Sequence, residues 1–283
     1  HFETIFISDI DPLTFGFLHL IYKSNPQAKM MVLDHHTINK DLLLNSRIVY
    51  VHPELLYENV EGSQLCCSKM NYELFSQCVD LQDYEFLKGI GMIGDYNQKT
   101  RGKEIKHIAQ RLNVDYSQIK KPEDWYETEF KKALNIIDGA RAIGDEQVRQ
   151  ATDILKDSVT FSDIVKIKNP FKEPIELLEK YKHTWKKNAR IDETHKIITL
   201  KIEEPYRIGS ILSTIISSQK PEYTFLIIKK EGNRAHIHAR NQSHLLHLGK
   251  LLHRVCEKLE ESHGGGHIPA AGAHFLKKDL AEF

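Results

Sequence analysis

The chain has 283 residues, enough for about two domains of roughly 150 residues each. Hydrophobic residues make up 41% of it and charged residues 28%, which excludes an intrinsically disordered chain, a collagen-like chain and a coiled coil. The 39 lysines and arginines balance the 39 aspartates and glutamates. Attraction to nucleic acid or to a membrane would therefore have to come from a local basic patch.

The cysteines and the apolar stretches bear on the cellular compartment. No C-x-x-C pair occurs among the four cysteines, which are Cys66, Cys67, Cys78 and Cys256. We therefore expect neither a disulfide framework nor a zinc finger. No apolar stretch approaches the roughly 18 residues of a membrane helix, and the opening residues lack the features of a secretory signal. We expect a cytoplasmic protein with reduced cysteines and no membrane partner.

The first elements predict a βαβ unit. Residues Thr4 to Ser8 form a short apolar run, Pro12 to Lys23 has apolar residues at helical spacing, and Lys29 to Leu33 is a second short run. Both strands lack polar alternation, which favours a parallel sheet that is covered on both faces over a hairpin. The first run begins almost at His1, and we expect that a preceding segment is missing.

Helices are expected next, so the first domain is predicted to be α/β with a helical second half. The polar segment from Asn97 to Lys103 is predicted to be a loop between two of these helices. Apolar residues at helical spacing mark four ranges: Glu61 to Val79, Gln82 to Met92, Lys103 to Arg111 and Glu127 to Ile137.

The domain boundary is expected between residues 169 and 190, where two prolines and a basic cluster are typical of a connector that contains a helix. We therefore predict a first domain over residues 1–168, a linker helix in 169–190 and a smaller C-terminal α/β domain over 191–283. The glycine-rich segment from His263 to Gly272 is expected to be irregular. Strands are expected at 196–202, 223–229 and 235–240, and helices at 208–217 and 243–259.

Polar side chains follow both strands of the βαβ unit. Asp9 closes the first strand, and Asp34-His35-His36 closes the second. The carboxyl ends of parallel strands meet at one edge of a sheet, so these side chains are expected to converge. Carboxylates and imidazoles together suit divalent Mn, Fe or Zn. The alternative is a solvated turn, and Asp95 considered alone is an ordinary loop carboxylate.

The segment from His263 to Gly272 is a candidate phosphate site. Glycines allow backbone N–H groups to approach an anion closely, and His267 and Arg240 add donors suited to phosphate. The alternatives are that the glycines form a flexible loop, and that Arg240 pairs with a carboxylate and holds the domain together.

At these residues the chain resembles the DHH/DHHA1 phosphoesterases, which include RecJ-type exonucleases and nanoRNases. The naming motif is Asp34-His35-His36, and Phe6-Ile7-Ser8-Asp9 resembles the strand that precedes it. Gly94-Asp95 resembles the later metal-binding motif. The segment Gly264-Gly265-Gly266-His267-Ile268-Pro269-Ala270-Ala271-Gly272 is similar to the DHHA1 signature, and the resemblance covers nearly the whole chain.

One motif of the family has no counterpart here. The family opens with a further strand that carries a His-x-Asp-x-Asp motif and supplies most ligands of one metal ion, and no such motif precedes Asp9. Asp9-Ile10-Asp11 does not replace it, because DHH follows after one βα unit, as it does after the family's second motif. Either the first strand and helix are missing from this chain, or the protein is a non-catalytic relative.

The resemblance implies a role for each matched residue. Asp9 would bridge two Mn²⁺ ions, with Mg²⁺ as the alternative ion, and His35 and Asp95 would complete the ligand set. Asp34, His35 and His36 would be the catalytic group, with Asp34 orienting the neighbouring imidazole and His36 contacting the scissile phosphate. The substrate would be held in the cleft between the domains by His36, Arg240, Gly264, Gly265, Gly266 and His267.

The implied activity is that of an archaeal RecJ-like exonuclease that degrades single-stranded DNA or RNA by two-metal hydrolysis. One alternative is a nanoRNase or nucleoside-bisphosphate phosphatase, which would act only on short oligonucleotides or bisphosphates. Another is a degenerate scaffold associated with replication or a helicase. The expected partners are single-stranded nucleic acid or a short oligonucleotide, a replication or helicase protein, and a second copy of the chain in a homodimer.

Overall fold

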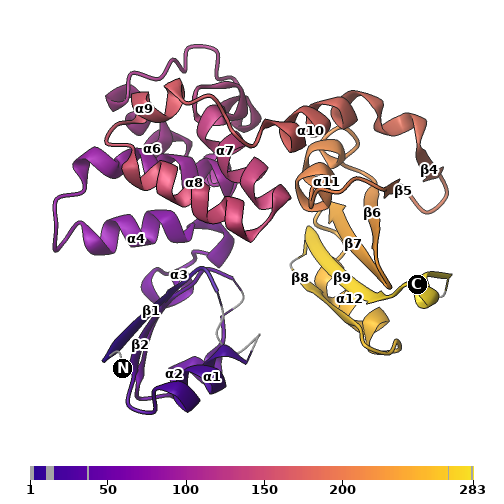
Figure 1. Ribbon diagram of the computed structural model, residues 1–283, viewed down its shortest axis with the longest axis horizontal. Coiled ribbons are helices and arrows are strands. Elements are labelled where there is room, and N and C mark those ends of the chain that lie inside the picture. Colours follow the sequence, from indigo (N-terminus) through magenta and orange to yellow (C-terminus); the bar gives the residue numbers. More distant parts are fainter. Residues whose placement is uncertain (1–2, 11–15, 37, 267, 282) are drawn as a thin grey trace. The chain divides into compact units, whose positions relative to one another are not determined.

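The computed structural model describes residues 3–10, 16–36, 38–266, 268–281 and 283 (Figure 1). They pack as two compact units. The first lies within His1–Leu134 and Ile154–Lys168, and the second within Asn135–Asp153 and Asn169–Phe283. Each unit therefore draws on two stretches of chain. The predicted domain boundaries at residues 168 and 191 stay a prediction.

The first unit contains a three-stranded parallel sheet in the order β1-β2-β3. Strand β1 (Thr4–Ser8), helix α1 (Phe17–Ser24) and strand β2 (Lys29–Leu33) form the predicted βαβ unit. Strand β3 (Ile48–Val51) was not predicted, because a run of four residues is too short to stand out by periodicity. It extends the row of strand ends on which the candidate site lies.

Helices make up the rest of the first unit, and aromatic rings fill its core. The ring of Phe161 lies 5.0 Å from Phe130 and 6.4 Å from Phe86, and Trp125 lies 6.3 Å from Phe130. In the described part of the chain, no helix is long and apolar enough to cross a membrane. Helices α7 and α8 are each divided between the two units. The helices from α2 to α9 are Lys40–Leu43, Pro53–Leu56, Cys67–Phe75, Glu85–Gly94, Gln98–Arg111, Phe130–Ile143, Asp145–Asp157 and Phe161–Lys166.

The prediction of a loop from Asn97 to Lys103 is wrong. Helix α6 already begins at Gln98 and bends at Arg101, whose φ of −117° is not helical. The polar residues that favoured a loop form the first turns of this helix, while Ile105 and Ile108 are buried further along it. Tertiary packing of the later turns therefore extends the helix backward into a polar segment.

The second unit is built on a six-stranded mixed sheet in the order β4-β5-β6-β7-β9-β8, in which only β5 and β6 pair in parallel. Helices α10 (Lys172–Thr184), α11 (Gly209–Ser217) and α12 (Leu248–Cys256) accompany this sheet. The strands β4 to β9 are Ala189–Asp192, Ile197–Ile202, Thr224–Glu231, Arg234–Asn241, His263–Gly266 and Ala270–Leu276.

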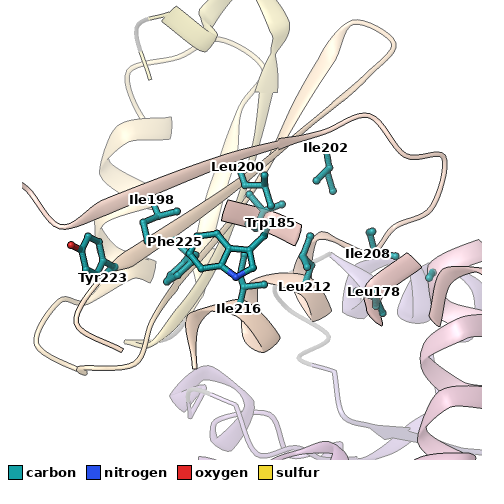
Figure 2. Close-up of a cluster of buried hydrophobic side chains, with 12 residues drawn as sticks. Leu178, Trp185, Ile198, Leu200, Ile202, Ile208, Leu212, Ile216, Tyr223 and Phe225 are labelled. Atoms are coloured by element: carbon teal, nitrogen blue, oxygen red, sulfur yellow. The ribbon is translucent and has the colours of Figure 1, made fainter. Parts of the chain in front are cut away.

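Two clusters of buried side chains stabilise the second unit. In the first cluster, Trp185 packs edge-on against Phe225 at 5.3 Å, and Leu178 of α10 also contributes to it (Figure 2). The segment predicted to be a connector therefore places side chains in a core. The second cluster joins α12 to the last strands and includes Leu252 and Phe275. Burial of such side chains contributes roughly 1.5–3 kcal/mol each.

The glycine-rich segment is a strand and not the irregular loop that its composition predicted. Residues His263–Gly266 form β8, which pairs with β9. A β-carbon built on Gly264 would lie 2.6 Å from the carbonyl oxygen of Leu252, and one on Gly249 would lie 2.0 Å from that of Gly266. Helix α12 therefore lies directly on this strand, and the close approach requires glycine at these positions.

Candidate metal centre

Polar residues follow the aligned ends of the first unit's strands. The backbone N–H of Asp9 donates to the carbonyl of Leu33 at 2.9 Å, and that of Asp34 donates to the carbonyl of Val51 at 3.1 Å. These bonds continue the ladder of the sheet by one residue beyond each strand. Asp9 and Asp34 are thus held at the same edge, as the parallel topology predicted.

The imidazole of His35 lies between two carboxylates. Its Nε2 is 3.3 Å from Oδ1 of Asp9 and 3.5 Å from Oδ2 of Asp95, which follows the end of α5. The side chain of His35 is 11% exposed, whereas those of Asp9 and Asp95 are 58% and 43% exposed. The structure therefore brings together the three residues predicted to be metal ligands and leaves their carboxylates open to solvent.

The electrostatics of this trio favour positive charge. Burial lowers the pKa of His35, but the hydrogen bond to Asp9 and the charges of Asp95 and Asp9 outweigh it, so the pKa is raised. Burial raises the pKa of Asp9, but the hydrogen bond and charge of His35 outweigh it, so the pKa is lowered. The arrangement stabilises a cation between the carboxylates, either the proton on His35 or a metal ion.

Asp34 holds the neighbouring imidazole. Its Oδ1 lies 2.7 Å from Nδ1 of His36, and its side chain is 1% exposed while that of His36 is 43% exposed. The hydrogen bond to Asp34 is the main cause that raises the pKa of His36. Burial raises the pKa of Asp34, but the hydrogen bond and charge of His36 outweigh this effect, so the pKa is lowered. A buried carboxylate therefore orients a solvent-facing imidazole.

The site contains buried polar atoms that lack a hydrogen-bond partner among the described residues. These atoms are Oδ2 of Asp34 and Nδ1 of His35. An unsatisfied buried polar atom costs about 1–3 kcal/mol, so such atoms are expected where an ion or water completes the site. The residue types also fit a metal ion, because carboxylate oxygen and imidazole nitrogen are ligands of Mn²⁺.

Two groups of possible metal ligands share one carboxylate. The ligand atoms of Asp9, His35 and Cys67 lie within 4.8 Å of one another, and so do those of Asp9, Asp34 and His36. Asp9 belongs to both groups, which is the position that its predicted role as a bridging ligand requires. The assignment of individual ligands stays a prediction.

Sequence reasoning missed Asn97, a buried residue that connects the segments around the site. Its Oδ1 accepts from the backbone N–H of Cys66 at 2.8 Å, and its Nδ2 donates to the carbonyls of Ser63 and Asp95, each at 3.2 Å. Nothing in the local pattern distinguishes this asparagine from a helix N-cap or loop residue. Its role follows only from the tertiary contacts.

The predicted phosphate-binding residues lie on the second unit. Arg240 is opposite Ala270 in the sheet, and His238 is opposite Gly272, which is opposite Gly265. Alternate residues of a strand share a face, so these positions form one side of the sheet, the side away from α12. A β-carbon built on Gly265 would meet no atom within 4 Å, so this glycine faces open space. His267 lies outside the described residues.

A row of three histidines shares this face of the sheet, and sequence reasoning did not single it out. The rings of His236 and His274 lie 6.1 Å apart, and those of His274 and His263 lie 5.8 Å apart. Histidines at every second position, as in His236 and His238, are the sequence signal that could have revealed it. The predicted cleft between the domains stays a prediction.

The second part of the chain matches a known family, since residues 195–283 correspond to the DHHA1 domain. Comparison with curated proteins finds no match. Among solved structures, RecJ of Thermus thermophilus in complex with Mn²⁺ has a TM-score of 0.65 and 16% identity, covering 99% of this chain and 43% of that chain. The same RecJ has also been solved in complex with Mg²⁺.

Two further structures share the fold. The DHH domain of a protein assigned to a family of ribosomal proteins has a TM-score of 0.66 and 18% identity, covering 97% of this chain and 65% of that chain. An exonuclease RecJ bound to manganese has a TM-score of 0.59 and 15% identity, covering 99% of this chain and 73% of that chain. The chain thus spans less than half the length of the Thermus RecJ and about two thirds of the DHH-domain protein.

These likenesses confirm the predicted fold class, in which a parallel sheet with a helical second half precedes a smaller α/β domain. Asp34-His35-His36 lies at a strand end in the first unit, and the DHHA1 match covers most of the second. Residues 195–283 thus belong to the DHHA1 domain family, and the chain as a whole has the fold of the RecJ and DHH-domain structures.

Proposed function

We propose that this protein is a metal-dependent phosphodiesterase that degrades single-stranded DNA or RNA as an exonuclease. The observation that carries the proposal is the meeting of Asp9 and Asp95 at Nε2 of His35, on a strand edge that is open to solvent. The exonuclease RecJ bound to manganese, which shares the fold, supports it. Hydrolysis of phosphate esters is the chemistry for which such carboxylate and imidazole sets are used.

Asp9, His35 and Asp95 would hold Mn²⁺, with Asp9 bridging to a second ion and Mg²⁺ as the alternative. When bound, such ions activate water as a nucleophile and stabilise negative charge on the phosphate oxygens. The protein's own contribution would be to fix these side chains at one edge of the sheet, and the backbone hydrogen bonds of Asp9 and Asp34 to the neighbouring strands support this.

His36 would contact the scissile phosphate. The hydrogen bond to Asp34 fixes one ring nitrogen, so the other is directed away from the buried carboxylate. Because Asp34 raises the pKa of His36, the ring is protonated over a wider pH range and can donate a charge-assisted hydrogen bond to an anion. Asp34 is therefore a positioning residue in this proposal.

The part of this sheet face around Gly265, beside the region that α11 covers at His238, would hold the substrate backbone. Arg240 offers a fixed fork of donors that matches phosphate geometry, and Gly265 leaves space for close approach. The histidine row lies on the same face and adds rings on which bases can stack. His267 would act with these residues as a further hydrogen-bond donor to the phosphate.

The test measures hydrolysis of single-stranded DNA and RNA of one sequence, and of a dinucleotide, with Mn²⁺, with Mg²⁺ and with a chelator. We expect Mn²⁺-dependent hydrolysis of the long strands that His35→Ala abolishes and the control His107→Ala, on the exposed surface of α6, preserves. Hydrolysis of the dinucleotide but not of the long strands would contradict the exonuclease assignment and indicate a phosphodiesterase of short oligonucleotides. Metal binding without hydrolysis of any substrate would overturn the proposed enzymatic activity and favour the alternative of a non-catalytic scaffold protein.

A further inference from the structure

Cys67 lies in the metal centre although no prediction assigned it a role. It is the first residue of α4, is buried, and its sulfur lies 3.7 Å from the carbonyl oxygen of Leu33 at the end of β2. Its Sγ, a carboxylate oxygen of Asp9 and a ring nitrogen of His35 all lie within 4.8 Å of one another. A thiol is therefore a third donor beside two predicted metal ligands.

We propose that Cys67 is a metal ligand and that, with Asp9 and His35, it increases the affinity of this centre for Zn²⁺ relative to Mn²⁺. The inference rests on the metal site of the proposed function and concerns which ion that site selects. Thiolate sulfur is a soft ligand that favours zinc, whereas a site of carboxylates and imidazole alone suits manganese as well. One cysteine thus adds a soft sulfur ligand to a site of carboxylate and imidazole ligands.

The spacing of Asp9 and His35 suits a tetrahedral ion. Ligand bonds of about 2.0–2.3 Å place the donor atoms of a tetrahedral site about 3.3–3.8 Å apart. Oδ1 of Asp9 and Nε2 of His35 are separated by 3.3 Å, and the sulfur of Cys67 lies within 4.8 Å of a ligand atom of each residue. Asp95 approaches the same nitrogen at 3.5 Å but does not join this group of mutually close donors.

Cys67 is buried beside these two predicted ligands. On coordination the sulfur gives its proton to solvent and forms a bond to the ion, with no change of oxidation state. Cys66 and Cys256 are also buried, but among the described residues neither belongs to a group of three or more such donors.

Cobalt tests the ligand directly, because Co²⁺ bound to thiolate shows a sulfur-to-metal charge-transfer band in the near ultraviolet. The full chain, titrated with Co²⁺, is expected to show this band together with visible ligand-field bands. Cys67→Ser is expected to lose the charge-transfer band and to keep the ligand-field bands, while the control Cys66→Ser keeps both. Cys67→Ala provides a second variant without a hydroxyl, and circular dichroism checks that each variant folds.

Competition between Zn²⁺ and Mn²⁺ gives the second measurement. Cys67→Ser is expected to lower zinc affinity at least about tenfold, with a much smaller change in manganese affinity. Cobalt bound to the native chain without a charge-transfer band, or a band that persists in Cys67→Ser, would overturn the role of Cys67 and leave the proposed function intact. Equal cobalt binding by native protein and His35→Ala would overturn the metal centre itself, and with it both proposals.

Discussion

Gly62 lies directly behind the backbone of His35, since a β-carbon built on Gly62 would come within 2.2 Å of the carbonyl oxygen of His35. We expect Gly62→Ala to push this segment away, to lower Mn²⁺ affinity at least about tenfold and to cost about 1–3 kcal/mol of stability. Calorimetric titration with Mn²⁺ and urea unfolding measure the two effects.

The control for this variant is Gly102→Ala in α6, where an added β-carbon would meet no atom within 4 Å. Alanine is a better helix former than glycine, so this variant is expected to keep its metal affinity and to gain up to about 1 kcal/mol. Unchanged metal affinity in Gly62→Ala would show that His35 does not depend on the space that Gly62 leaves.

Asn97→Ala is expected to destabilise the first unit by about 1–3 kcal/mol, because it leaves the buried N–H of Cys66 without its acceptor. Metal affinity is expected to fall as well, since Asp95 loses a backbone contact. Urea unfolding compares it with Gln110→Ala on the exposed surface of α6. Equal unfolding free energies for the two variants would contradict the positioning role of Asn97.

His238 is expected to make the second unit sensitive to acid. Burial, with the charges of His236 and Lys229, lowers its pKa from 6.5 to about 4. Gly209 of α11 contributes to this burial, because it lies where its β-carbon would be 2.2 Å from the ring. Because the pKa of His238 is lowered by folding, the unfolded state takes up a proton before the folded state does as the pH falls. The free energy of unfolding is therefore highest above pH 6.5 and decreases as the pH falls toward 4.

The loss would amount to about 3 kcal/mol when complete. His238→Gln is expected to flatten the fall in stability between pH 6.5 and pH 4, which unfolding curves across this range would measure. His183→Gln, at an exposed histidine of α10, is the matched control. An equally steep fall in His238→Gln and native protein would contradict the prediction.

Alanine substitutions at two neighbouring glycines of β8 are expected to have different effects, one on stability and the other on substrate binding. Gly264→Ala would place a β-carbon 2.6 Å from the carbonyl oxygen of Leu252, so we expect a loss of about 1–3 kcal/mol. Gly265→Ala meets no atom within 4 Å and is expected to change stability by less than about 0.5 kcal/mol while weakening the binding of single-stranded oligonucleotide. Thermal melts and binding titrations measure both, and undiminished affinity in Gly265→Ala would remove this residue from the substrate surface.

The strand-end residues of the site could be located from the sequence because two physical rules relate the pattern of apolar residues to position in the sheet. Short apolar runs mark buried strands, and parallel pairing brings the ends of those strands to one edge. Asp9 and Asp34 could therefore be placed near one another without coordinates. Asp95 carries no such pattern, and only the family resemblance associated it with them.

Other features depend on contacts between distant residues and could not be predicted locally. Asn97 bonds to Cys66 and Ser63, which are 31 and 34 residues away in the sequence. Glycine disfavours strands, so composition argued against β8, and the close packing of α12 against Gly264 overrides that preference. In both cases tertiary packing decides what local preference leaves open.

The amide of Asn97 has a consequence for how the first unit assembles. Two segments distant in the sequence, residues 63–66 and residues 95–97, are joined through this one buried side chain. If the site binds an ion as proposed, ion binding and the ordering of these segments would form a single linked equilibrium. The ion would then stabilise the folded first unit, and protection of both segments from hydrogen exchange would rise together as the ion is added.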